Sequence, residues 1–295
     1  TWLLAEGHTI DGVAPKNSKL LESSNKLNLH CVEGNEQKSW QHQDYYSLVN
    51  IPDNSLLSGM IEKAISIGEK ADIILNFSYD WLPIWMTLNI EIPIAHIISM
   101  GSESYVISNL IRNVYSKYPN NFAFHSKTQA SDYPFIKNPI VVGNGFKLSN
   151  YIFQDSKNGP LGWVGRVAPE KGLEDAAYVA NALGEKLNVW GIIQDETYAL
   201  KIEKMFSPGI LVWNGFLETD KLQRELGTCR ALLNTPKWNE AYGNVVVEAL
   251  ACGVPVVAYK RGGPGEIIEH CKTGYLAKPD DKDSLLKYLK VINNI

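Results

Sequence analysis

Short apolar runs alternate along the chain with longer segments in which apolar residues recur at helical spacing. Ala71–Phe77 is one such run, and the Trp81–Leu88 segment that follows it has the period of a helix. Apolar runs bounded by turn residues are typical of buried strands, and strands that alternate with helices favour βα units around a parallel sheet. The pattern therefore predicts an α/β protein.

The same alternation continues through both halves of the chain. Strands are predicted at Thr9–Ala14, Leu27–Val32, Ala71–Phe77, Ile92–Ile98, Phe122–His125, Ile140–Gly143, Leu161–Val164, Leu187–Trp190, Ile210–Trp213, Ala231–Asn234, Val254–Ala258 and Tyr275–Ala277. Helices are predicted at Leu56–Lys70, Trp81–Leu88, Glu103–Tyr118, Leu173–Leu183, Thr197–Phe206, Thr219–Leu226, Val245–Ala251, Gly265–Glu269 and Ser284–Ile292. The polar stretch Lys147–Gly159 has no sustained apolar period and is predicted to join the halves.

Two domains also agree with the length of the chain. It has 295 residues, and a domain usually has about 100–200. We therefore expect two Rossmann-like, doubly wound domains, residues 1–150 and residues 151–295. Ligands of open α/β sheets bind outside the carboxyl ends of the strands, so we expect the site in a cleft between the two domains.

Composition and charge exclude several classes of protein. Lys and Arg total 28 against 32 for Asp and Glu, and the net charge of −4 has the wrong sign for a nucleic-acid binder. The four cysteines make no C-x-x-C motif, which argues against a zinc site or a disulfide framework and suits a reducing cytoplasm. No stretch approaches the ~20 apolar residues of a membrane helix. The sequence leaves the oligomeric state open.

The first candidate chemistry lies in Gly165-Arg166-Val167-Ala168-Pro169-Glu170-Lys171-Gly172, between a predicted strand and a predicted helix. Arg166 and Lys171 would flank a helix N-terminus, whose free N–H groups favour an anion. Such a pair could clamp a diphosphate and stabilise the negative charge that grows on it as a bond breaks. Two solvated cations at an ordinary βα turn are the alternative.

The second candidate is Glu240-Ala241-Tyr242-Gly243-Asn244-Val245-Val246-Val247-Glu248, which places two carboxylates eight residues apart. Gly243 allows a close approach of the backbone, and the N–H groups of 242–245 could cradle an anion. Because carboxylates accept hydrogen bonds from vicinal hydroxyls, one could hold a hexose and the other a ribose. Alternatively, Glu248 is an acid that the helix macrodipole stabilises by ~0.3–1 kcal/mol.

Three further stretches carry weaker signals. Lys260-Arg261-Gly262-Gly263-Pro264-Gly265-Glu266 could approach a ligand with its backbone, or form an ordinary turn. Gly143-Asn144-Gly145-Phe146 lacks the third glycine of a dinucleotide-binding loop, which argues against an oxidoreductase. Asp280-Asp281-Lys282-Asp283 has possible metal-ligand spacing, but helix capping is favoured, so no metal site is predicted.

Taken in order and at their spacing, these motifs resemble the donor half of retaining, nucleotide-sugar-dependent glycosyltransferases of the GT4 family. The matching landmarks are Gly165-Arg166, Glu170-Lys171-Gly172, Asn214-Gly215-Phe216, the pair Glu240 and Glu248, the run Glu248–Val257, Gly262-Gly263 and Thr273-Gly274. The first half is similar only in its rhythm, in Pro93–Ile98 and in Asn144-Gly145-Phe146. Within the family, Trp163–Arg166, Pro236–Asn244 and Ile98–Ser102 are most similar to peptides of the cyanobacterial UDP-glucose:tetrahydrobiopterin glucosyltransferases.

The resemblance implies the GT-B fold, with an acceptor-binding N-terminal domain and a donor-binding C-terminal domain that face a central cleft. It implies that Arg166 and Lys171 hold the donor diphosphate, that Glu240 holds the sugar hydroxyls, and that Glu248 holds the ribose. Further donor contacts are implied for Phe216, Leu217, Ala241, Tyr242, Gly243, Asn244 and Val245. Such enzymes use no metal or other cofactor, and retention is expected at the front face without a protein nucleophile.

The sequence departs from the family at two places. Ser99 stands where family members usually have a histidine, while His96 lies within the preceding strand and is interpreted as a core residue. Acceptor contacts are expected instead from Ser99, Gly101, Ser102, His125 and Asn144. The family's first strand and Gly-rich loop are absent from a chain that begins at Thr1 and not at Met, so we expect the natural N-terminus to be missing and the catalyst to be incomplete.

The expected function is transfer of a hexose, glucose from UDP-glucose, to a small acceptor, with tetrahydrobiopterin preferred. Phe77, Tyr79, Trp81 and Trp85 could stack on a flat acceptor, or could pack in the core. A GT-B epimerase or phosphorylase is one alternative, although neither a second acid/base pair nor a second anion site is evident. A regulatory module that binds a nucleotide sugar is the other alternative.

Overall fold

The computed structural model describes residues 2–20, 23–155 and 158–292 of the chain. Its contacts divide the chain into two compact units, each described below by itself. Unit 1 comprises Thr1–Phe124 and Asp132–Ile140, and unit 2 comprises His125–Ser131 and Val141–Ile295. The expected domain boundary between residues 150 and 151 stays a prediction.

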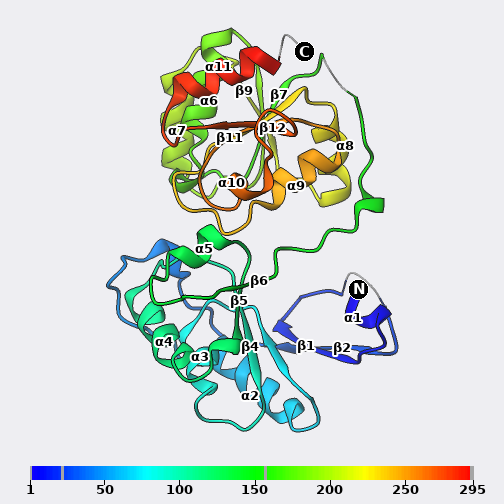
Figure 1. Cartoon of the computed structure of the whole chain (residues 1–295), viewed down its shortest axis with the longest axis vertical. Helices are drawn as coiled ribbons and strands as arrows, with labels where there is room; N and C mark the ends of the chain where they lie inside the picture. Colours follow the sequence, from blue (N-terminus) through cyan, green and yellow to red (C-terminus); the bar gives the residue numbers. More distant parts are fainter. Residues whose placement is uncertain (1, 21–22, 156–157, 293–295) are drawn as a thin grey trace. The chain divides into compact units, whose positions relative to one another are not determined.

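Unit 1 contains two separate parallel sheets (Figure 1). β1 (Ile10–Pro15) and β2 (Leu27–Val32) pair with each other, and β3 (Ile74–Asn76), β4 (Ile94–Ile98), β5 (Phe122–Phe124) and β6 (Ile140–Val141) form the second sheet in that order. The helices are α1 (Trp2–Ala5), α2 (Leu56–Gly68), α3 (Trp81–Met86) and α4 (Tyr105–Tyr115), with 3-10 turns η1 (Trp40–His42) and η2 (Pro119–Asn121). The alternating pattern thus predicted the strands but not the break between the two sheets.

Side-chain caps fix where the helices of unit 1 begin. Asp80 accepts a hydrogen bond from Trp81 N at 2.6 Å before α3, and Ser104 accepts one from Ile107 N at 3.4 Å before α4. Such caps satisfy N–H groups that have no partner within the helix. Because α4 begins so soon after β4, the loop that holds Ser99–Ser102 stays at the carboxyl end of this strand.

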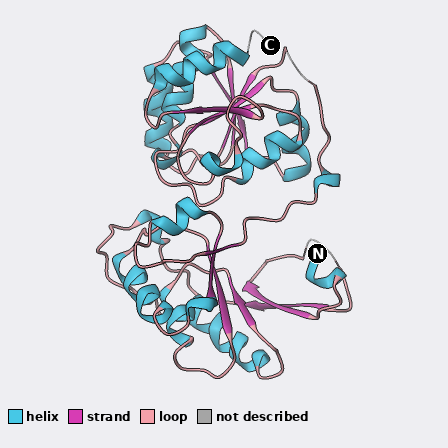
Figure 2. Ribbon diagram, viewed as in Figure 1, coloured by secondary structure: helices cyan, strands magenta, loops and turns pink. Residues whose placement is uncertain are grey.

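Unit 2 is built on a six-stranded parallel sheet with helices on both faces (Figures 1 and 2). Its strands are β7 (Leu161–Val164), β8 (Leu187–Trp190), β9 (Leu211–Gly215), β10 (Ala231–Asn234), β11 (Val256–Tyr259) and β12 (Gly274–Ala277). Its helices are α5 (Lys127–Ser131), α6 (Leu173–Leu183), α7 (Glu196–Met205), α8 (Thr219–Gly227), α9 (Asn244–Ala251), α10 (Pro264–Ile267) and α11 (Lys282–Ile292), with 3-10 turns η3 (Leu148–Asn150) and η4 (Pro169–Lys171).

The strand order of this sheet is β12-β11-β10-β7-β8-β9, so the direction of winding reverses between β7 and β10. Two apolar cores cover the two faces of the sheet. One contains Leu173 of α6, Ile202 of α7 and Leu285 of α11, and the other contains Leu226 of α8 and Val246 of α9. This is a doubly wound arrangement, in which ligands bind at the carboxyl edge where the winding reverses.

The stretch predicted to be a linker is docked on unit 2 over residues 148–155. Gln154 N donates to the carbonyl oxygen of Cys252 at 2.9 Å. Gly253 has φ +84°, and a Cβ there would lie 2.4 Å from the carbonyl oxygen of Gln154. These backbone contacts hold the segment against the end of α9. Among the described helices, none combines the length and the apolar character that a membrane crossing requires.

Candidate active site

The candidate site lies where the winding of the unit 2 sheet reverses, between the loops that follow β7 and β10. The β7 loop contains Arg166 and runs through η4, which ends at Lys171, before α6 begins at Leu173. Gly172 joins η4 to α6 with φ +66°, and a Cβ there would lie only 2.1 Å from the carbonyl oxygen of Thr235 after β10. A glycine at this position therefore lets the two loops approach each other closely.

Lys171 and Glu240 meet between these loops. The Nζ of Lys171 lies 2.5 Å from Oε2 of Glu240, and each side chain is 18% exposed. Trp238 holds both residues, because its indole Nε1 donates to Glu240 Oε2 at 3.3 Å and its ring centroid lies 5.0 Å from the Lys171 amine. The sequence predicted the cation and the acid but missed Trp238, although it lies only two residues before Glu240.

Arg166 is also hydrogen-bonded to neighbouring side chains. Its guanidinium donates through Nη1 to Gln194 Oε1 at 2.6 Å, and Nη2 lies 3.2 Å from Glu170 Oε1. Both cations of the first motif therefore lie beside acceptor groups on neighbouring loops. A bound diphosphate could accept the same hydrogen bonds from them.

Glu248 lies on α9, one turn after its start, as the motif predicted. Its Oε1 accepts a hydrogen bond from the phenol of Tyr151 at 3.4 Å. Burial raises the pKa of the Glu248 carboxyl above its ordinary value, while this hydrogen bond opposes the rise. Burial and the charge of Glu248 raise the pKa of Tyr151 to about 12, so the phenol keeps its proton at neutral pH.

The stretch from Glu240 to Val245 lies between β10 and the first turn of α9 and is supported by close backbone contacts. Gly243 precedes α9 with φ +96°, and the turn after β11 packs against this stretch, with Gly263 N donating to Glu240 O at 2.7 Å. A Cβ at Gly263 would lie 1.9 Å from the carbonyl oxygen of Tyr242. The Gly-Gly turn that was a weak signal in the sequence thus acts as a close backbone support for the predicted donor loop.

A network of ion pairs holds the segment that precedes Glu240. Lys237 forms ion pairs with Asp175 and, at 3.2 Å, with Asp280, while Arg261 donates to Asp280 at 2.5 Å and to the carbonyl oxygen of Pro236 at 3.0 Å. Burial alone would lower the pKa of Lys237, but the hydrogen bonds to Asp175 and Asp280 raise it. The network fixes the segment that leads from β10 to Glu240.

The other predicted donor residues lie around this loop and at the end of β9. Ser126 Oγ donates to the carbonyl oxygen of Ala241 at 2.8 Å, and the ring of Tyr242 stacks on Phe146 at a centroid distance of 6.3 Å. Phe216 is exposed and Leu217 packs against the core that includes α9. The remaining predicted donor residues, Asn244 and Val245, form the first turn of α9.

The predicted acceptor residues fall in both units. In unit 1, Ser99 is exposed, the carbonyl oxygen of Gly101 accepts from the Tyr133 phenol at 2.8 Å, and Ser102 Oγ lies 2.7 Å from Ser108 Oγ. In unit 2, His125 Nδ1 lies 3.1 Å from the carbonyl oxygen of Gly143, and Asn144 Nδ2 donates to Asn244 Oδ1 at 2.5 Å. Their role toward an acceptor stays a prediction.

His96 is a core histidine, as the sequence indicated. It is fully buried, with Nδ1 3.0 Å from Asn76 Nδ2 and Nε2 2.8 Å from Thr87 Oγ1, and its ring stacks on Phe122. Burial lowers the pKa of His96 to about 4. In the aromatic group, core packing is confirmed for Tyr79, which is buried, whereas Phe77 is 65% exposed. Stacking of these rings on an acceptor stays a prediction.

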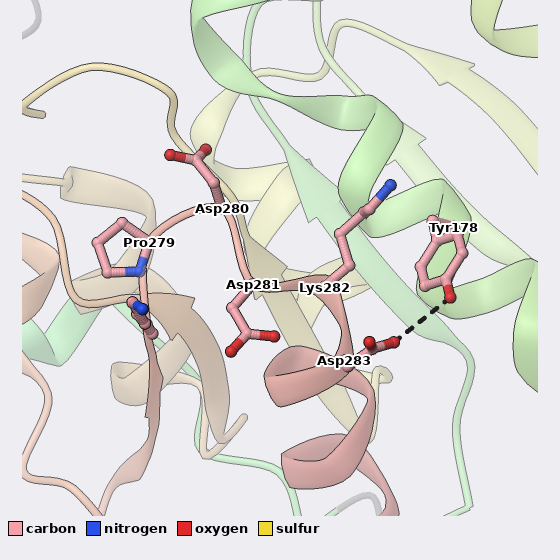
Figure 3. Close-up of a pocket in the computed structure, with 7 residues that line it drawn as sticks. Tyr178, Pro279, Asp280, Asp281, Lys282 and Asp283 are labelled. Carbon is pink, nitrogen blue, oxygen red and sulfur yellow. Dashed lines mark hydrogen bonds between the residues drawn. The ribbon is translucent and has the colours of Figure 1, made fainter.

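The acidic run after β12 lines a hollow of about 380 Å³ (Figure 3). Asp281 Oδ1 accepts from Ser284 N at 2.9 Å and so caps α11, which confirms the helix-capping interpretation. Asp283 accepts from the Tyr178 phenol at 3.4 Å, and the amine of Lys282 lies 4.6 Å from the Tyr178 ring centroid. In the part of the chain that the structure describes, no group of three or more His, Cys, Asp and Glu could hold a metal ion.

Residues 153–294 match the family model described as "Glycosyl transferases group 1". An uncharacterized glycosyltransferase of Methanocaldococcus jannaschii is 26% identical over 97% of this chain and 86% of that protein. The sulfoquinovosyl transferase of Arabidopsis thaliana is 33% identical over 44% of this chain, but this chain spans only 25% of that protein.

Solved structures show the same fold. The sucrose-phosphate synthase of Thermosynechococcus elongatus has a TM-score of 0.78, with 16% identity over 98% of this chain and 81% of that chain. Anabaena HepE, solved in complex with UDP-glucose, has a TM-score of 0.68 and 20% identity over 81% of this chain and 72% of that chain. At these identities the likeness establishes the architecture, two Rossmann-like domains of the GT-B type.

Proposed function

We propose, because residues 153–294 match the family model described as "Glycosyl transferases group 1", that this chain transfers a hexose from a nucleoside diphosphate sugar to a small acceptor with retention of configuration. The donor that we propose is UDP-glucose, and the acceptor is a flat heterocycle of the tetrahydrobiopterin type. The HepE structure, which holds UDP-glucose in a protein of the same fold, supports this donor. The exposed faces of Phe77 and Trp85 in unit 1 support a flat acceptor.

One observation carries the proposal: Lys171 and Glu240 meet at the point where the winding of the sheet reverses. A cation can bind the diphosphate, and a carboxylate can accept hydrogen bonds from the sugar hydroxyls. Here the Lys171 amine and the Glu240 carboxylate are hydrogen-bonded to each other. The scissile bond of a nucleotide sugar joins these two parts of the donor. The proximity of the pair supports a donor bound with its scissile bond beside Lys171 and Glu240.

In the proposed reaction, the bond between the anomeric carbon and the phosphate oxygen breaks as the acceptor oxygen bonds to the same carbon. The acceptor proton passes to the leaving phosphate oxygen on the same face of the sugar, so that no protein nucleophile is needed. Arg166 and Lys171 stabilise the charge that develops on the diphosphate, Glu240 orients the hexose, and Glu248 accepts from the ribose hydroxyls. The mechanism requires no metal ion.

The test is to incubate the full-length protein with a panel of sugar nucleotides, each with tetrahydropterin, lipid and sugar acceptors. Formation of an α-glucosylated product from UDP-glucose, identified by the anomeric coupling in its NMR spectrum, would support the proposal. Product of inverted configuration would contradict retention. Tight binding of UDP-glucose without hydrolysis or transfer to any acceptor would favour a regulatory module instead.

A further inference from the structure

The phenol of Tyr151 contacts Glu248 from a segment 97 residues earlier in the sequence, which belongs to none of the donor motifs. We propose that Tyr151 is a positioning residue that orients the Glu248 carboxylate for the ribose of the donor. The inference rests on the proposed function, because it assigns a partner to the acid that is proposed to hold the ribose.

The position of Tyr151 is set independently of this hydrogen bond. Its backbone N donates to the carbonyl oxygen of Leu148 at 3.0 Å at the end of η3, and Gln154 N donates to Cys252 O three residues later. Its ring packs against the core of buried residues that includes Val246 and Ala249 of α9. The backbone and the ring of Tyr151 are therefore held by other contacts. The hydroxyl is the part of the side chain that contacts the Glu248 carboxylate.

The contact leaves Glu248 able to bind a diol. The phenol donates one hydrogen bond to Oε1, while an ionised carboxylate has about four acceptor positions on its two oxygens. One fixed donor restricts rotation of the carboxylate without filling it, which lowers the entropy that donor binding must remove. Tyr151 can therefore orient the acid and leave it open to two ribose hydroxyls.

The contact also favours the ionised form of the acid. Burial raises the pKa of Glu248, and the Tyr151 hydrogen bond counteracts that rise. The Cys252 thiol lies one helical turn along α9, and its own pKa is raised by burial and by Glu248, so it stays neutral beside the acid. Without the phenol, the pKa of Glu248 would rise further, and ribose binding would be lost at a higher pH.

The experiment measures UDP-glucose binding by calorimetry from pH 4.5 to 8 for the full-length wild-type protein and for Tyr151→Phe. UDP-glucose suits this range because its diphosphate has no terminal phosphate that titrates within it. Tyr151→Phe keeps the ring in its core contacts and removes the hydroxyl alone. We expect about tenfold weaker binding of UDP-glucose to Tyr151→Phe at neutral pH, as for loss of one hydrogen bond to a charged group. We also expect the acid limb of the binding profile, the fall in affinity on acidification, to begin at a higher pH.

Tyr178→Phe is the matched control, because the Tyr178 phenol also donates to a carboxylate at 3.4 Å, that of Asp283 on the surface of unit 2. It should bind UDP-glucose as the wild type does. Wild-type affinity and an unmoved acid limb in Tyr151→Phe would overturn the inference. If Glu248→Gln also bound like the wild type, or the wild type bound no UDP-glucose, the proposed donor site itself would be wrong.

Discussion

The amine of Lys171 lies 2.5 Å from the carboxylate of Glu240, although 69 residues separate them in the sequence. The two residues come together because they follow β7 and β10, which are neighbours in the sheet of unit 2. The cation proposed for the diphosphate and the acid proposed for the sugar thus form an ion pair with each other. A donor that enters must therefore provide Lys171 with a phosphate oxygen and Glu240 with hydroxyl groups.

Lys171→Ala should reduce kcat by about two to three orders of magnitude. The variant removes a cation from the developing charge of the leaving diphosphate, and loss of one such donor typically costs ~3–4 kcal/mol of transition-state stabilisation. The loss should be larger in kcat than in the affinity for UDP-glucose, because the charge on the phosphate oxygen grows as the bond breaks. Steady-state transfer kinetics and calorimetric binding together measure both quantities.

Lys272→Ala is the control for this variant, since Lys272 also pairs with a glutamate, Glu269, but its side chain is 76% exposed. Transfer by this control should match that of the wild type, because an exposed ion pair contributes little. Wild-type turnover in Lys171→Ala would remove this residue from the mechanism.

Gly263→Ala should disrupt the donor loop without touching a charged group. The added Cβ would lie 1.9 Å from the carbonyl oxygen of Tyr242, so the backbone between Glu240 and Gly243 must shift. A displacement of about 1 Å at a binding site can cost ~100-fold, and we expect a fall of that order in kcat/KM for the donor. Gly265→Ala, two residues further on, places its Cβ 3.5 Å from Lys260 in ordinary contact and should stay active. Equal activity of the two variants would show that the turn does not support the loop.

The sequence predicted the parts of this site that depend on local patterns. Each strand of unit 2 was located by its apolar run, and Arg166, Lys171 and Glu240 were chosen because they lie in the charged loops that follow those strands. Strand order then brings such residues together, which is why the β7 and β10 loops meet. The donor contacts of all these residues stay predictions.

The contacts that the sequence did not predict come from distant segments. Tyr151 reaches Glu248 across 97 residues, from a polar stretch whose only signal was the short apolar run Tyr151-Ile152-Phe153. The break between β2-β1 and the sheet of β3–β6 was also missed, because apolar runs show that strands exist and not which strands pair. Packing between segments far apart in the chain determines both features.

Transfer should persist after dialysis against EDTA. In the proposed mechanism, Arg166, Lys171 and the backbone N–H groups of the donor loop supply the positive charge that a divalent ion supplies in other enzymes. The acids beside them are already occupied, Glu240 by Lys171 and Glu170 by Arg166. Rates measured in EDTA and after addition of Mg²⁺ should agree, and a loss that Mg²⁺ alone restores would contradict the mechanism.

The stability of unit 1 should fall as the pH decreases below about 6.5, because of His96. Burial lowers the pKa of this histidine to about 4 in the folded protein, against an ordinary value of 6.5. Between these values the unfolded chain binds a proton that the folded protein excludes, so acidification favours unfolding. From pH 7 to pH 5 this group alone should remove about 2 kcal/mol from the free energy of unfolding.

Urea denaturation at both pH values, for the wild type and for His96→Gln, would measure the difference. The variant should be less stable at pH 7, since Thr87 and Asn76 lose their hydrogen bonds to the imidazole ring. Its free energy of unfolding should, however, fall by about 2 kcal/mol less on acidification than that of the wild type. An equal loss in both proteins would show that another group causes the acid sensitivity.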